Sequence, residues 1–93
     1  MVNKNILKVR KELDKLDNRL LEIIKKRMRL VNVVIKNKRY KKEIVDKKRI
    51  SIILKNITKK SKQKKIDIKI TQKIWKSMIW AFIDYEFRNF KKK

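Results

Sequence analysis

Apolar residues recur along residues 5–39 with the period of a heptad, which predicts one long amphipathic helix. They fill the two apolar positions of the repeat: Ile6, Val9, Leu13, Leu16, Leu20, Ile23, Leu30 and Val34. The series has one exception, because Arg27 stands where the seventh apolar residue is expected. The pattern predicts a helix from Asn3 or Asn5 to Arg39 or Tyr40, about 50 Å long.

This helix is too long to be covered by the rest of its own chain, because a compact chain of 93 residues has a radius of gyration of only about 12 Å. Its apolar surface is also wide. Further apolar residues flank the main stripe: Leu7, Leu21, Ile24, Met28, Val31 and Ile35. We therefore expect a second copy of the chain to cover the helix, which gives a homodimer with intertwined long helices.

Two shorter helices are expected after a connector over Lys41 to Val45. Asp46 is a suitable N-cap for a helix to about Lys59, and Asp67 for a helix to about Phe90. A charged joint, Lys60 to Ile66, separates them. The residues expected to face inward are Ile50, Ile53, Leu54 and Ile57 in the second helix, and Ile74 or Trp75, Ile79, Phe82 and Phe90 in the third. The fold class is therefore all-α, with three helices in one domain over residues 1–93.

Arg27 indicates an anionic ligand, since a guanidinium on an apolar face is costly unless an anion meets it. Lys38 follows eleven residues later, so it shares the face of Arg27 at about 16 Å along the axis. Arg10 precedes Arg27 by seventeen residues, which turns it about 100° away and places it about 25 Å distant. Arg10 and Arg27 of one straight helix are therefore expected to serve different pockets.

Glu86 is a second ionisable residue on an apolar stripe, in line with Ile79 and Phe82. Asp84 is expected to point the opposite way. The ordinary explanation for Glu86 is an ion pair with Arg27, Lys38 or Arg49.

Composition narrows the possible chemistry. The chain has 31 Lys and Arg against 9 Asp and Glu, a formal charge of +22, spread along its whole length. Attraction to nucleic acid is expected to be non-specific. Without histidine or cysteine, a disulfide, a thiolate nucleophile and a zinc site are all disfavoured. No apolar run is long enough to span a bilayer and no signal-peptide pattern is present, so we expect a cytoplasmic protein.

Five segments in order resemble the all-helical chorismate mutases of the AroQ class, a family related to the isochorismate-pyruvate lyases. The segments are Ile6 to Arg10, Leu13 to Leu21, the pair Arg27 and Lys38, Asp46 to Arg49, and Ile66-Asp67. The second resembles the family's Ile-Asp-x-Ile-Asp-x-x-Leu-Leu signature. The fourth resembles its Asp-Pro-Glu-Arg. The resemblance covers nearly the whole chain.

The resemblance implies a role for each matching residue. Arg10 would enter the partner's site and bind a substrate carboxylate, and Arg27 would bind a carboxylate in its own site. Lys38 would contact a carboxylate and the ether oxygen. Asp46 would face the ring hydroxyl, and Arg49 would complete the cationic wall.

Three further positions of the implied site depart from the usual pattern. Ile50 replaces a glutamate that helps to hold the hydroxyl, Phe82 replaces a small polar residue, and Glu86 replaces the common glutamine at the ether oxygen. The implied reaction is the pericyclic rearrangement of chorismate to prephenate, a step in aromatic amino-acid biosynthesis. It needs no nucleophile, base, metal or cofactor.

Three alternatives remain open. An isochorismate-pyruvate lyase, which forms salicylate, would also suit Ile50 and the aromatic third helix, whereas Asp46 favours the mutase. A non-enzymatic nucleic-acid-binding helical protein explains the charge but not the positions of Arg27 and Glu86. A catalytically inactive family member kept as a regulator is the third.

Overall fold

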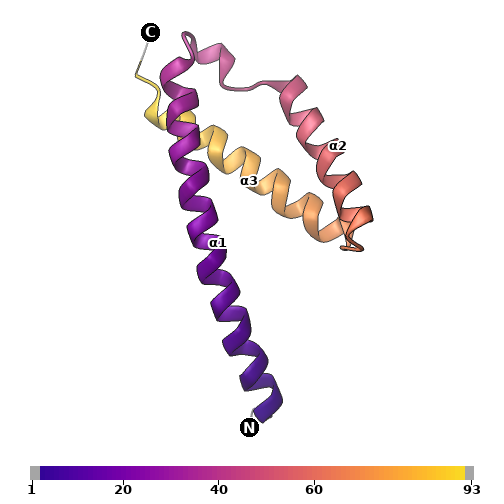
Figure 1. Ribbon diagram of the computed structural model, residues 1–93. Helices are drawn as coiled ribbons and strands as arrows, with labels where there is room; N and C mark the ends of the chain where they lie inside the picture. Colours follow the sequence, from indigo (N-terminus) through magenta and orange to yellow (C-terminus); the bar gives the residue numbers. More distant parts are fainter. Residues whose placement is uncertain (1–2, 92–93) are drawn as a thin grey trace. The chain divides into compact units, whose positions relative to one another are not determined.

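The structure is a computed structural model that describes residues 3–91, and all of its regular secondary structure is helical. The elements are α1 (Lys4–Asn37), the short 3-10 helix η1 (Lys41–Glu43), α2 (Lys47–Gln63) and α3 (Ile68–Asn89) (Figure 1). The three predicted helices and the all-α class are confirmed. Within the described residues, none of these helices has the length and apolar character needed to cross a membrane.

The chain forms two compact units, Met1–Leu30 and Val31–Lys93. The first is the greater part of α1, which Asn3 caps by accepting a hydrogen bond from the Asn5 backbone N–H at 2.7 Å. Its large apolar side chains are 38 to 67% exposed. They are Ile6, Leu7, Val9, Leu13, Leu16, Leu20, Leu21, Ile23, Ile24, Met28 and Leu30. This unit therefore has no core of its own.

The second unit contains the hydrophobic core. Its buried members come from the end of α1, from the connector and from α3: Ile35, Ile44, Ile79, Ile83 and Phe90. Half-buried apolar residues surround them, namely Val31, Val45, Ile50, Ile53, Leu54 and Tyr85. Ile44, at 2% exposure, is the most deeply buried of the core residues. The connector is thus part of the core.

The helix α1 ends at Asn37, two or three residues before the predicted limit. The turn that follows is stabilised by Glu43, whose carboxylate accepts hydrogen bonds from the backbone N–H groups of Arg39 (2.8 Å) and Tyr40 (3.4 Å). A side chain therefore satisfies the backbone donors that a longer helix would have paired.

The helix α2 is longer than predicted. Asp46 caps its start, as expected, by accepting from the Arg49 N–H at 3.0 Å. Its end at Gln63 corrects the prediction of Lys59 and shortens the joint to residues 64–67. The physical reason is Ser61, 3% exposed, which donates to the Ile57 carbonyl at 2.6 Å and shares a hydrogen bond of 2.8 Å with Thr71. This buried hydroxyl pair holds the last turn of α2 against α3.

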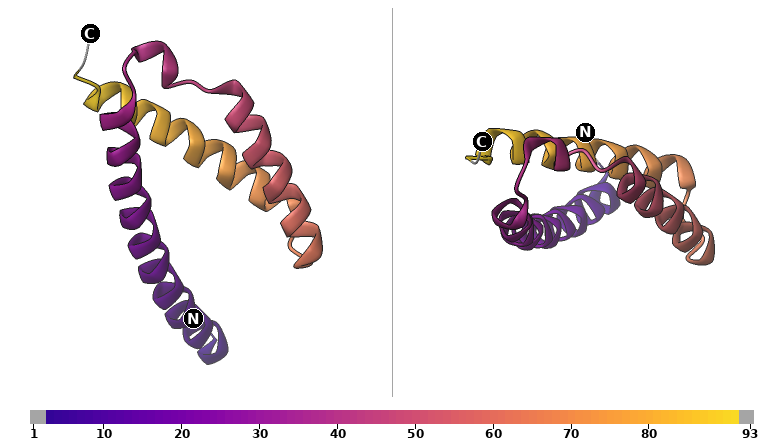
Figure 2. Two further views of the ribbon diagram at one scale, coloured as in Figure 1. Left: turned by 45° about the horizontal axis from the view of Figure 1, so that its top comes forward. Right: turned by 90° about the horizontal axis from the view of Figure 1, so that it is seen from above.

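The helix α3 begins after the N-cap Asp67, which accepts from the Lys69 N–H at 2.8 Å. It meets α2 at the joint, and the two helices diverge from there (Figure 1, Figure 2). Of the predicted stripe, Ile79 and Phe90 are buried and Phe82 and Trp75 are half-buried, but Ile74 is 52% exposed. The buried stripe of α3 also includes Ile83, which was not among the residues predicted to face inward.

The joint between α2 and α3 contains a lysine in a conformation that favours glycine. Lys65 has φ of 57°. Its N–H bonds to the Lys62 carbonyl at 3.2 Å, and the Ile66 N–H bonds to the Ser61 carbonyl at 2.9 Å. These two bonds form a Schellman motif, whose left-handed residue is usually glycine. A Cβ at this position costs about 1 kcal/mol.

Lys65→Gly is therefore expected to raise the free energy of unfolding by about 1 kcal/mol, because it removes the clash of the Cβ with the backbone. Urea unfolding measures the change. The control is Lys60→Gly, an exposed position inside α2, which should lower stability by about 1 kcal/mol. A loss of stability in Lys65→Gly would contradict the motif.

Candidate active site

The second unit brings together two of the predicted site residues, Lys38 and Glu86. Lys38 directly follows α1, and Glu86 lies in the last two turns of α3. The Lys38 Nζ donates to Glu86 Oε1 at 2.9 Å and to the Ile44 carbonyl at 3.5 Å. The two side chains are 20% and 10% exposed. Lys38, one of the three partners considered for Glu86, is therefore in contact with it.

The position of Glu86 follows from the apolar stripe of α3. Ile79, Ile83, Glu86 and Phe90 recur at spacings of four, three and four, so they share one face, and all four are buried. A carboxylate on this face loses most of its hydration and requires a cation nearby. Asp84, on the opposite face as predicted, is exposed and pairs with Arg88 at 2.9 Å.

A hydrogen bond holds the elements that carry this pair. The Tyr85 hydroxyl donates to Asn32 Oδ1 at 2.7 Å, which joins α3 to the last turns of α1. Neither residue was among the predicted site residues, and no pattern in the sequence singles them out. The same is true of the Ile44 carbonyl, which lies in a connector.

The start of α2 holds three other predicted residues. Asp46 and Arg49 are both exposed, and Asp46 Oδ1 accepts from the Arg49 N–H in the cap of α2. Ile50, one residue on, is half-buried and packs against the core. Phe82, on α3, is also half-buried.

Arg10 and Arg27 lie in the first unit. Arg10 is exposed, whereas Arg27 is half-buried. Every other residue in the range 3–30 is exposed. The apolar residues on either side of it, Ile23 and Leu30, are 53% and 67% exposed. The side chain that departs from the heptad is thus more covered than the apolar members next to it.

Residues 3–91 contain no group of three His, Cys, Asp or Glu side chains placed to bind a metal ion. The second unit of this all-helical chain thus holds a shielded ammonium against a carboxylate. An ammonium has three N–H donors, so it can also donate to an atom of a bound anion.

The family model of chorismate mutase type II matches residues 9–87, and the chain belongs to this family. Comparisons with curated proteins and with solved structures gave no match. The resemblance seen in the sequence is thereby confirmed. The chain is an isomerase with chorismate mutase activity, which converts chorismate to prephenate, and chorismate is its substrate.

The ion pair makes a prediction about stability. Lys38→Met should lower the free energy of unfolding by about 2–4 kcal/mol, because it leaves the Glu86 carboxylate buried without its cation. Adding Glu86→Gln to that variant should restore most of the loss, since a neutral amide is far less costly to bury. Urea unfolding of the two variants measures both effects.

The matched control is the exposed pair of Asp84 and Arg88, whose side chains are 69% and 65% exposed. Arg88→Met should change stability by no more than about 0.5 kcal/mol. A double variant as unstable as Lys38→Met alone would show that Lys38 stabilises the fold through packing and not through Glu86.

Proposed function

We propose that Lys38 and Glu86 form the catalytic end of the chorismate site, where both act on the ether oxygen of the substrate. The observation that carries the proposal is the 2.9 Å contact between their side chains, 20% and 10% exposed. Negative charge develops on that oxygen as the C–O bond breaks. Hydrogen-bond donors in a shielded site stabilise such charge more than water does.

The cationic residues would supply affinity and orientation. Chorismate is a dianion, so Arg27 and the Arg10 of a second copy would each bind a carboxylate, and Arg49 would complete the cationic wall of the pocket. The rearrangement is pericyclic and needs the substrate held in a compact, chair-like conformer. Fixing both carboxylates restricts the substrate to that conformer, which lowers the barrier through proximity.

The remaining residues of the proposed site line the substrate. Asp46 would accept a hydrogen bond from the ring hydroxyl with the oxygen that does not cap α2. Ile50 and Phe82, both half-buried, would form apolar contacts where related enzymes have polar groups. Lys38 has three N–H donors, of which two point at Glu86 and the Ile44 carbonyl, so a third can reach the ether oxygen.

Glu86 has to be protonated to contribute. An ionised carboxylate only accepts hydrogen bonds, and it would repel an oxygen that is gaining negative charge. In the ligand-free pair the carboxylate accepts from Lys38. Substrate binding would bring the ether oxygen within reach of the third N–H of Lys38, and the Glu86 carboxyl, protonated from solvent, would donate as well.

The proposed catalytic form is a homodimer in the cytoplasm, each chain being one domain over residues 1–93. It is supported by the first unit, where large apolar side chains of α1 are 38 to 67% exposed. Burying each of them is worth about 1.5–3 kcal/mol. A second copy offers the same surface and can cover it. Arg10 of each chain would then enter the partner's site.

The proposed role of Glu86 makes a prediction about its amide variant. Glu86→Gln should raise the rate of prephenate formation, because an amide N–H donates to the ether oxygen whereas a carboxylate can only accept. The rate is measured with saturating chorismate. A variant slower than the wild type would remove Glu86 from this role.

The same assay separates the alternatives. Incubation with isochorismate should give no salicylate or pyruvate, whereas the lyase would release both. A chain that converts neither substrate would be an inactive family member.

The shared site makes a second prediction. Arg10→Ala and Arg27→Ala should each lose activity by roughly 10- to 150-fold, because each removes a charged hydrogen bond of about 1.5–3 kcal/mol. Unfolding and refolding the two variants together should restore about a quarter of the wild-type activity, since half of the dimers are mixed and one of their two sites is intact.

The control for this experiment mixes Arg10→Ala with the chain that carries both substitutions, which leaves every site defective. Recovery in the control would show that refolding alone restores activity. Co-purification of an untagged variant with an affinity-tagged one establishes that mixed dimers form, and sedimentation equilibrium gives the number of chains in the assembly. Absence of recovery in proven mixed dimers would place Arg10 in the site of its own chain, and a folded monomer at micromolar concentration would exclude the dimer.

A further inference from the structure

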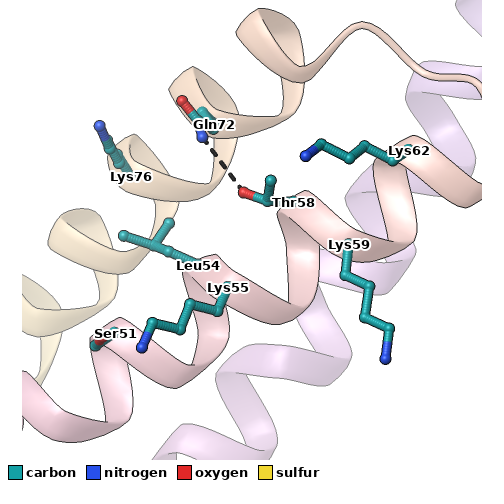
Figure 3. A pocket seen from close by; sticks show the side chains of 8 residues that line it. All are labelled: Ser51, Leu54, Lys55, Thr58, Lys59, Lys62, Gln72 and Lys76. Carbon is teal, nitrogen blue, oxygen red and sulfur yellow. Dashed lines mark hydrogen bonds between the residues drawn. The ribbon is translucent and has the colours of Figure 1, made fainter.

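A groove of about 560 Å³ runs between α2 and α3, within the second unit. Six residues of α2 and two of α3 line it: Ser51, Leu54, Lys55, Thr58, Lys59, Lys62, Gln72 and Lys76 (Figure 3). Leu54 is its one apolar residue. The Gln72 amide donates to the Thr58 hydroxyl at 3.3 Å across the two helices. Half of the lining residues are thus lysines, and none is acidic.

Three of these lysines form a row on one side of α2. Lys55, Lys59 and Lys62 are spaced by four and three residues, which separates them by about 6 and 4.5 Å along the axis. Lys76 lines the groove from α3. Like charges at these spacings repel and destabilise a helix by a few tenths of a kcal/mol per pair. An anion bound in the groove would relieve this repulsion.

The chain itself supplies no such anion nearby. Between Asp46 and Asp84 the sequence contains one carboxylate side chain, Asp67, which caps α3. Within residues 3–91, none of the ion pairs described includes a groove lysine. This part of the chain therefore leaves the groove lysines solvated and accessible to an anion from outside.

The groove is separate from the Lys38–Glu86 site. On α2, Lys55 is turned about 160° from Ile53 and about 120° from Arg49. Ile53 packs against the core, and Arg49 belongs to the proposed chorismate site. A ligand in the groove therefore lies on the flank of α2 that faces away from that site.

We propose that this groove binds the phosphodiester backbone of a nucleic-acid strand. A row of exposed point charges matches a linear anion with regularly repeated charges better than a compact dicarboxylate. The lining has no aromatic side chain on which a base could stack. Binding is therefore independent of base sequence and driven by the release of counterions from the phosphates.

The test compares two variants with the same loss of charge. The groove variant replaces Lys55, Lys59, Lys62 and Lys76 by Gln. The control variant replaces four exposed lysines of the same helices outside the groove: Lys48, Lys60, Lys69 and Lys73. The probe is a fluorescent single-stranded DNA of about 12 nucleotides and mixed sequence, within the usual site size, followed by anisotropy at several salt concentrations.

The groove variant is expected to lose at least about tenfold in affinity, and the slope of log affinity against log salt should shrink by about 3, or 0.7 for each lysine. The control variant should lose less than about threefold. An inorganic polyphosphate chain should displace the DNA, and chorismate should not. Prephenate formation by both variants should match the wild type, which shows that they are folded.

Equal losses in the two variants would overturn the proposal, because binding would then follow net charge alone. Displacement by inorganic monophosphate as effective as by polyphosphate would overturn it as well, since that indicates a compact anion site. If the groove variant fails to fold, the pair Lys55→Gln and Lys59→Gln is compared with Lys60→Gln and Lys73→Gln by the same criteria. The proposal does not depend on the chorismate site, whose activity is read separately.

Discussion

A carboxylate on the apolar stripe of α3 imposes the main constraint on the second unit. Glu86 is 7% exposed and stands in line with Ile79, Ile83 and Phe90, so its charge has to be matched from another element. Lys38 provides the match from the position that directly follows α1, and Glu43 stabilises the turn that comes next. The Ile44 carbonyl accepts from the same ammonium. The Lys38 ammonium therefore bonds both to the buried carboxylate of α3 and to the buried connector, and it neutralises the charge of Glu86.

The first unit presents the opposite situation, because its apolar residues are exposed and its arginine is half-buried. A helix of this kind gains stability only when another surface covers it. In the proposed dimer that surface is a second α1, and the fold and the active site then depend on the same association. Arg10 and Arg27, about 25 Å apart on one helix, would contribute to two different sites. Loss of the dimer would therefore remove substrate-binding charge as well as apolar burial.

Much of this arrangement could be predicted from the sequence, because helix period and caps are local. Asp46 and Asp67 cap the helices as expected, and the phase of α3 places Glu86 inward and Asp84 outward. The predictions failed where tertiary contacts decide. Ser61 extends α2 past Lys59 through its hydrogen bond to Thr71. No local sequence pattern predicts this pairing. Ile44 is buried in a connector, and the core of α3 includes Ile83, which the predicted stripe did not contain.

The two anion sites inferred for this chain differ in what surrounds their cations, and that difference determines their ligands. Lys38 is four-fifths shielded and already bonded to a carboxylate. An anion that enters has to compete with Glu86 and place one acceptor atom in line with a lysine N–H. Affinity there depends on geometry, and salt screens it weakly. The groove lysines have long, solvated side chains and no acidic lining residue. They attract any closely spaced row of charges, and salt screens them strongly. A single buried glutamate is therefore what allows a chain of such high positive charge to keep one selective site.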